Sequence, residues 1–173
     1  ISEMPDRTAA LLLGDAAPVQ ARLLADAQVL ADWGARVIAI TCNTAHAFLP
    51  AIERDLPVPV VNMVTQTAAA LKALGCRRAG ILGTDGTLQT GLYHRALEAQ
   101  GIQPVSPPPE AQRQVMHLIY EEIKRGLPGS EESFNDVTAE LKAAGCDHVV
   151  LACTELSAYE DWHSVDGMCG DAM

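Results

Sequence analysis

Apolar residues along the chain follow two alternating spacings, and this alternation predicts an α/β fold. Leu23, Ala27 and Leu30 recur at the spacing of a helix face, after a helix start at Asp15 and Pro18. Residues 37–40 then form an uninterrupted apolar run, which is typical of a parallel strand covered on both faces.

The same reasoning extends over the rest of the chain. We expect further helices over residues 44–54, 65–74, 88–100, 111–124 and 132–144, and strands over residues 58–61, 79–82 and 148–152. Pro57 and Pro59 restrict the strand at 58–61 to an edge or an end of its sheet. Alternating helices and strands predict mostly parallel sheets with helices on both faces.

An internal repeat runs through this alternation. Cys42 lies eight residues after Gly34, and Cys153 lies eight residues after Gly145. A third copy, after Gly75, leads to a Gly-Thr pair instead. Any α/β protein repeats the helix–strand rhythm, so only the matched cysteines are distinctive. They are expected at the carboxyl ends of strands, where open α/β sheets bind ligands.

Composition and charge narrow the classes of partner. The chain has 173 residues, of which 49% are hydrophobic, enough for one domain or for two small lobes. Twelve Lys and Arg against 22 Asp and Glu give a net charge of −10, which argues against nucleic acid or an anionic membrane as the main partner. No apolar run approaches the roughly 18 residues of a membrane span. No secretion signal opens the chain either, so we expect a cytoplasmic protein.

The five cysteines do not form a disulfide or zinc-binding pattern, because no C-x-x-C pair occurs among Cys42, Cys76, Cys146, Cys153 and Cys169. Cys76 and Cys146 each follow a helix-ending glycine, which favours packing at a turn. Cys169 has no assigned role. Cys42 and His46 have the spacing of one helical turn, but no third ligand is in register, so we expect no metal.

Cys42 and Cys153 share a setting that favours chemistry. Cys42 ends a strand just before the helix expected from Thr44, and Cys153 with Thr154 repeats the arrangement. The free amides of a helix N-terminus stabilise a thiolate and can hold a carboxylate. Two such sites facing each other across a cleft would place one thiol on each face of a small molecule, as two-base proton exchange requires.

Four separated motifs resemble the aspartate/glutamate racemase family, closest to its aspartate racemase-like branch. They are P-D-R-T-A at 5–9, T-C-N-T-A-H at 41–46, G-T-D-G-T-L-Q-T-G-L-Y at 83–93 and A-C-T-E at 152–155. The resemblance implies two pseudo-symmetric α/β lobes, each with a mostly parallel sheet flanked by helices, and an active site in the cleft between them. It also implies a homodimer, catalysis without a cofactor, and an opening strand that this chain lacks. We expect one lobe over residues 1–62, rejoined by the tail 165–173, and a second over 63–164.

The resemblance also implies a role for each site residue. Cys42 and Cys153 would be the paired acid/base thiols. The α-carboxylate would be held by Asn43, Thr44 and Thr154; Thr84 and Thr87 would line the cleft; Arg7 and Lys124 would contact the side-chain carboxylate or tune the thiols. Composition alone would leave Arg7 and Lys124 as surface cations.

The implied activity is racemisation of aspartate or a related acidic amino acid. Glu155 is the tenth expected site residue, at the substrate. It stands where glutamate racemases carry histidine, which argues against strict glutamate specificity. Two alternatives keep the same fold: a dicarboxylate isomerase or decarboxylase of the same superfamily, and a non-catalytic carboxylate-binding protein.

Overall fold

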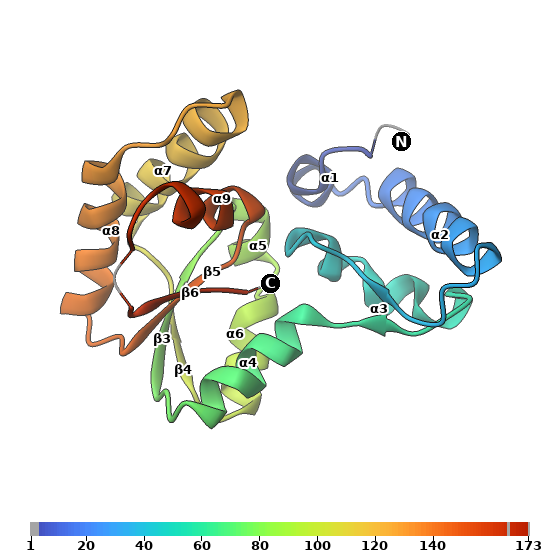
Figure 1. Cartoon of the computed structure of the whole chain (residues 1–173), viewed down its shortest axis with the longest axis horizontal. Coiled ribbons are helices and arrows are strands. Elements are labelled where there is room, and N and C mark those ends of the chain that lie inside the picture. The colour runs from blue at the N-terminus through green and yellow to red at the C-terminus, as the bar shows by residue number, and fades with distance from the viewer. Residues whose placement is uncertain (1–3, 166, 173) are drawn as a thin grey trace.

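The chain folds into two α/β lobes, shown side by side in Figure 1. This computed structural model describes residues 4–165 and 167–172. The first lobe contains, in order, α1 (Arg7–Leu13), α2 (Ala17–Asp32), β1 (Ile38–Ala39), the 3₁₀ turn η1 (Thr44–Ala47), α3 (Leu49–Ile52), η2 (Glu53–Asp55) and β2 (Val60–Val61).

The second lobe contains the remaining elements. They are α4 (Met63–Ala73), β3 (Arg78–Leu82), α5 (Asp85–Gln89), α6 (Leu92–Ala99), β4 (Gln103–Val105), α7 (Pro109–His117), the π turn η3 (Leu118–Glu122), η4 (Ile123–Arg125), α8 (Glu131–Ala143), β5 (His148–Leu151), α9 (Thr154–Trp162) and β6 (Cys169–Asp171).

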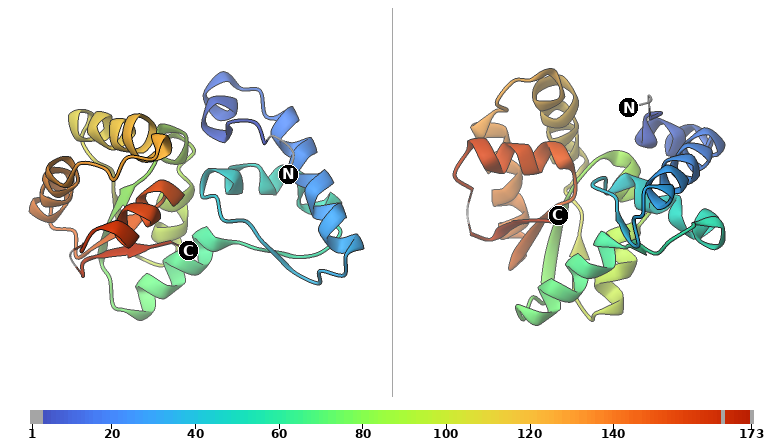
Figure 2. Two further views of the ribbon diagram at one scale, coloured as in Figure 1. Left: turned by 45° about the horizontal axis from the view of Figure 1, so that its top comes forward. Right: turned by 45° about the vertical axis from the view of Figure 1, so that its right-hand side comes forward.

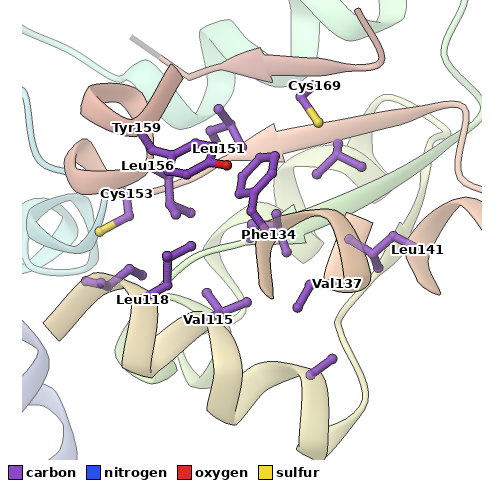
Figure 3. Packing of buried hydrophobic residues seen from close by; sticks show 14 of the residues in the cluster. Val115, Leu118, Phe134, Val137, Leu141, Leu151, Cys153, Leu156, Tyr159 and Cys169 are labelled. Atoms are coloured by element: carbon purple, nitrogen blue, oxygen red, sulfur yellow. The ribbon is translucent and has the colours of Figure 1, made fainter. Parts of the chain in front are cut away.

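The second lobe has a four-stranded parallel sheet in the order β4-β3-β5-β6. Successive residues along these strands point to opposite faces of the sheet and belong to two separate hydrophobic cores. Leu82 and Leu151 pack with residues of α7, α8 and α9, whereas Ile81 and Val150 pack with residues of α4 and α6. Figure 2 shows these helices on opposite sides of the sheet, and Figure 3 shows the first of the two cores. The expected arrangement of parallel strands between two layers of helices is therefore confirmed.

The first lobe is smaller. Its sheet has two parallel strands, with Ile38 opposite Val60, and its core gathers residues of α1, α2, η1 and α3. Residues 37–40 were expected to be covered on both faces, but Val37 is exposed and β1 alternates between a buried and an exposed residue. That expectation was wrong, because Ala39 and Val61 line a cavity of about 530 Å³, so that side of the short sheet is not closely packed in the described part of the chain.

Several expected helices are broken at identifiable residues. The helix expected over 44–54 is split into η1, α3 and η2, and Pro50, which has no N–H to donate, lies in the first turn of α3. The helix expected over 88–100 is split into α5 and α6 at Gly91, which has φ +62°. Four elements of the described chain were not expected: α1, β4, α9 and β6.

The tail departs from its expected place. We expected residues 165–173 to rejoin the first lobe, but β6 pairs with β5 and extends the sheet of the second lobe, with Val149 opposite Cys169. The backbone of β5 has a free edge on the side away from β3, and β6 satisfies its hydrogen bonds. Residues 1–3, 166 and 173 of the expected lobes lie outside the described residues.

No helix in the described segments of the chain is both long enough and apolar enough to cross a lipid bilayer.

Candidate active site

Cys42 and Cys153 come from different lobes and line the same small polar cavity. Cys42 follows β1, and Cys153 is the residue that precedes α9, directly after β5. Figure 3 shows the sulfur of Cys153 at the margin of the apolar core, directed away from it. The cavity has a volume of about 30 Å³ and is lined by Asp6, Arg7, Thr8, Cys42, Asn43, Thr44, Thr84, Tyr120, Lys124, Cys153, Thr154 and Glu155.

A guanidinium lies beside the first thiol. Arg7 is in the first turn of α1, and its side chain is within hydrogen-bonding reach of the Cys42 sulfur. Burial lowers the pKa of Arg7, but the neighbouring Cys42, Asp6 and Glu155 outweigh it and raise the pKa above its usual value. Arg7 therefore supplies a permanent positive charge next to the Cys42 sulfur.

A carboxylate lies beside the second thiol. The Sγ of Cys153 donates a hydrogen bond to Oε2 of Glu155 at 2.9 Å, and the Thr154 hydroxyl donates to the same oxygen at 3.0 Å. Burial, and next the negative charge of Glu155, raise the pKa of the Cys153 thiol well above its usual value. The thiol is therefore protonated at neutral pH. Cys42 also contributes to this shift, so the two sulfurs are close enough to interact electrostatically.

Four buried threonine hydroxyls form hydrogen bonds between the two lobes beside the cavity. Thr8 donates to Thr84 at 3.0 Å, and the hydroxyls of Thr44 and Thr87 are 3.0 Å apart. Thr84 also caps α5 by accepting from the backbone N–H of Thr87. Gly86 permits this contact between the lobes, since a Cβ there would lie 3.1 Å from the Cα of Thr8.

Asn43 presents an amide donor that has no partner among the described residues. The hydroxyl of Tyr93, a fully buried residue of α6, donates to Oδ1 of Asn43. This bond fixes the orientation of the amide, so Nδ2 is the group left over, and Nδ2 is buried without a hydrogen-bond partner. A buried donor of this kind is costly unless a ligand satisfies it.

Lys124 supplies the second cation at the cavity. Its Nζ lies 3.4 Å from Oδ2 of Asp6 and 4.0 Å from the ring centroid of Tyr120. Burial lowers the pKa of Lys124, but Tyr120, Asp6 and Glu155 outweigh it and raise the pKa. The ammonium group stays charged and reaches from the second lobe to the first.

His46 has a structural position. It is 1% exposed, its Nδ1 lies 2.9 Å from the carbonyl oxygen of Cys42, and its Nε2 accepts from the backbone N–H of Met63 at 3.3 Å. Both ring nitrogens are thus engaged by the backbone, which ties the Cys42 segment to the start of α4.

The structure brings together all ten residues singled out from the sequence: nine line the cavity, and Thr87 bonds to two of them. One part of the reasoning was wrong. Only Cys153 precedes a full helix, whereas Cys42 precedes a four-residue 3₁₀ turn, so its positive neighbour is Arg7 rather than a helix N-terminus.

Four further residues at the site were missed: Asp6, Thr8, Tyr93 and Tyr120. Asp6 and Thr8 flank Arg7 in the P-D-R-T-A motif, and the aspartate before a helix is a recognisable N-cap signal. Tyr93 ends the motif at 83–93. Nothing in the local pattern marks Tyr120.

A larger cavity of about 530 Å³ lies between α4, the first sheet and the β5–β6 edge. Apolar residues such as Val61, Leu71 and Val150 dominate its wall, and among the described residues that line it none is Lys or Arg. It lacks the positive charge that would bind an acidic molecule.

Comparison with known proteins agrees with this geometry. Residues 1–166 match the family model described as Asp/Glu/Hydantoin racemase. The chain belongs to this racemase family. Among its curated relatives is the broad specificity amino-acid racemase RacX of Bacillus subtilis (strain 168), 29% identical over 128 residues, which are 74% of this chain and 56% of RacX. A glutamate racemase of Aquifex aeolicus (strain VF5) is 33% identical over 132 residues, covering 74% of this chain and 49% of that protein.

Solved structures of the racemase family share the fold. The aspartate racemase of Picrophilus torridus superposes with a TM-score of 0.80 at 26% identity, covering 98% of this chain and 70% of that one. An aspartate racemase homologue from Pyrococcus horikoshii OT3 gives a TM-score of 0.74 at 27% identity, covering 90% and 69%. The chain spans about half the length of the curated relatives it matches.

Proposed function

We propose that the protein is a cofactor-independent amino-acid racemase that interconverts L- and D-aspartate or a related acidic amino acid. The observation that carries this proposal is the pair of thiols, Cys42 and Cys153, which reach one polar cavity from two lobes. The names of the racemases and aspartate racemases among its relatives support the same reaction class.

The proposed reaction exchanges one proton at the α-carbon. In one direction the Cys42 thiolate removes the α-proton, and the electron pair delocalises into the substrate carboxylate. The Cys153 thiol then gives its proton to the opposite face of the carbon. Cys42 ends as a thiol and Cys153 as a thiolate, and the reverse reaction restores both. Before substrate binds, burial and the charge of Glu155 favour the protonated form of Cys153, and Arg7 places a positive charge beside the Cys42 sulfur.

The substrate carboxylates would bind donors of known position. Asn43 Nδ2 is a buried donor without a protein partner, and Thr44 and Thr154 add hydroxyls for the α-carboxylate. Arg7 and Lys124 would attract the side-chain carboxylate and offset the acidity of the chain. Thr84 and Thr87 would hold the two lobes in register around the ligand.

The decisive experiment follows α-proton exchange. The protein is incubated with L- and D-aspartate separately in heavy water, and loss of the α-proton signal is measured by NMR, with glutamate as a second substrate. Exchange from both enantiomers is expected. A folded protein that binds aspartate without exchange is instead a carboxylate-binding protein, and consumption of a dicarboxylate without racemisation indicates the isomerase or decarboxylase alternative.

Two single variants test the role of the thiols. Cys42→Ser and Cys153→Ser should each lower racemisation by at least about a hundredfold, because a hydroxyl is a far weaker acid than a thiol. Cys146→Ser is the matched control, since it removes a buried thiol remote from the cavity. Racemisation at the parental rate by either single variant would rule out the two-thiol mechanism.

Two properties stay predictions: the cytoplasmic location expected from the sequence, and the homodimeric assembly implied by the family resemblance.

A further inference from the structure

A second cluster of reactive side chains lies at the opposite end of the sheet from the candidate active site. Cys76 precedes β3, and Asp147 and His148 stand at the start of β5. One thiol sulfur, one carboxylate oxygen and one imidazole nitrogen of these residues all lie within 4.8 Å of one another. They are brought together because β3 and β5 are parallel neighbours, with Ala79 opposite His148.

The carboxylate of Asp147 is held in place by backbone and side-chain donors. The Sγ of Cys76 donates to Oδ1 at 2.9 Å, the N–H of Arg78 donates to Oδ1 at 3.1 Å, and the N–H of Arg77 donates to Oδ2 at 2.9 Å. Fixed orientation by such donors is a regular feature of carboxylates that bind metals.

His148 adds an unsatisfied nitrogen to this arrangement. Its Nδ1 is buried and has no hydrogen-bond partner in the described part of the chain, and it lies 3.8 Å from Oδ1 of Asp147, beyond hydrogen-bonding distance. Hydrogen bonds within the cluster therefore account for the thiol and the carboxylate, but the imidazole nitrogen has only a 3.8 Å charge contact with Asp147.

We propose that Cys76, Asp147 and His148 bind a divalent cation of the zinc type. Sulfur, nitrogen and oxygen donors are the set that Zn²⁺ prefers. The ion would take the place of the thiol proton, which leaves for solvent, and Oδ1 would keep its bond from Arg78. For tetrahedral zinc the donor atoms should be about 3.3–3.6 Å apart. The 2.9 Å separation of sulfur and oxygen and the 3.8 Å separation of oxygen and nitrogen need to change by less than about 1 Å.

The internal repeat provides a matched control. Gly75 and Gly145 both end a helix at positive φ, +80° and +84°, and the next N–H, of Cys76 or Cys146, bonds back into that helix. Both thiols are buried. Cys146 is outside the trio, and the positive charge of Arg78 acts on it, although burial is the larger influence and raises the pKa of that thiol. Binding of a cation should therefore require the Cys76 thiol but not the Cys146 thiol, although both lie in equivalent turns.

The experiment measures binding of Co²⁺ and Zn²⁺ to the whole chain and does not depend on racemase activity. Co²⁺ added to the parent protein should produce a thiolate-to-cobalt charge-transfer absorption that Zn²⁺ abolishes by displacement. Cys146→Ser should retain that absorption, and Cys76→Ser should lose it. His148→Gln should weaken Co²⁺ binding at least about tenfold, as loss of one of three ligands requires. Circular dichroism in the presence of a chelator checks that each variant is folded.

Three results would overturn the proposal: no charge-transfer absorption in the parent, equal loss of it in Cys76→Ser and Cys146→Ser, or its retention in Cys76→Ser. The last would locate the cobalt at another thiol. Because the readout is metal binding, failure of this site leaves the racemase proposal untouched, and failure of racemisation leaves this site untouched.

Discussion

The hydrogen bond from Tyr93 to Asn43 decides which end of the Asn43 amide a ligand meets. Tyr93→Phe removes one hydroxyl and should let the amide rotate. We expect kcat/KM for aspartate to fall roughly tenfold, mainly through KM, because one oriented hydrogen bond to a charged carboxylate is worth about 1.5–3 kcal/mol and only part of it is lost.

Tyr159→Phe is the control for this change, because it removes another hydroxyl from a buried tyrosine that does not line the cavity. Steady-state kinetics of the two variants separate the roles. Equal effects of both substitutions would mean that Tyr93 acts only on stability.

Glu155 should control the protonation of Cys153. Burial, and next the charge of Glu155, raise the pKa of this thiol, so Glu155→Gln removes the second of these causes and should lower the pKa. In the direction that uses Cys153 as the base, kcat/KM rises with pH as the thiolate forms. That rise should therefore move to lower pH in the variant, while the opposite direction changes less.

The measurement is a pH profile of kcat/KM for each enantiomer. Glu132→Gln, an exposed position at the start of α8, makes the same chemical change away from the thiols and should leave both profiles in place. An unchanged profile in Glu155→Gln would show that Glu155 does not act on the reacting thiol.

At the scale of elements, α1 carries Arg7 and Thr8 into the cavity, and Asp6 holds its start. The Oδ1 of Asp6 accepts from the N–H of Ala9 at 2.8 Å, and Oδ2 pairs with Lys124. Asp6→Ala should cost about 1 kcal/mol of unfolding free energy through loss of the cap. It should lower kcat/KM by more than about tenfold, because Arg7 and Thr8 lose their fixed support.

Asp6→Asn keeps the cap and removes the charge, so it separates the two contributions. Burial raises the pKa of Asp6, but the N–H of Ala9 and the charge of Lys124 outweigh it and lower the pKa. The stability that this provides is present above about pH 4 and is lost as the pH falls through the lowered value. Urea unfolding at pH 7 and pH 3 measures it, and Asp6→Asn should show a smaller loss on acidification than the parent.

Among the strands, those that sequence patterns predicted well are the ones whose neighbours cover both faces. β3 and β5 match their apolar runs closely, because each run is buried on both sides of the larger sheet. The helices expected over 44–54 and 88–100 were too long. The apolar periodicity runs on through both ranges, but Pro50 and Gly91 interrupt the helices. The strand β4 was missed because it is a three-residue edge strand that contains a polar residue, Gln103, and a proline, Pro104, so no apolar run marks it.

The residues of the candidate site could be predicted from the sequence to different degrees. The internal repeat brought out Cys42 and Cys153 from spacing alone. Arg7 and Lys124 required the family resemblance, because a single cation at the start of a helix or in a short turn has no periodic signature. The contact between Tyr93 and Asn43 joins two lobes across 50 positions, and no local pattern indicates such a pairing.

At the scale of the whole molecule, the cavity is too small for the proposed substrate. Its volume of about 30 Å³ is roughly that of one water molecule. An amino acid is several times larger, so we expect the two lobes to move apart when it binds. The hydroxyl oxygens of Thr8 and Thr84 lie 3.0 Å apart and join the two lobes at the cavity, so this bond should break if the lobes move apart.

A reversible crosslink at this contact tests the requirement. In a Thr8→Cys, Thr84→Cys double variant the new sulfurs take the place of two oxygens in contact, near the separation a disulfide needs. Oxidation should abolish α-proton exchange, and reduction should restore it to the level of the reduced double variant. Mass spectrometry of peptides verifies the crosslink, and the two single variants, treated identically, control for oxidation of Cys42 and Cys153. Full activity of the crosslinked protein would mean that the substrate enters without separation of the lobes at α1 and α5.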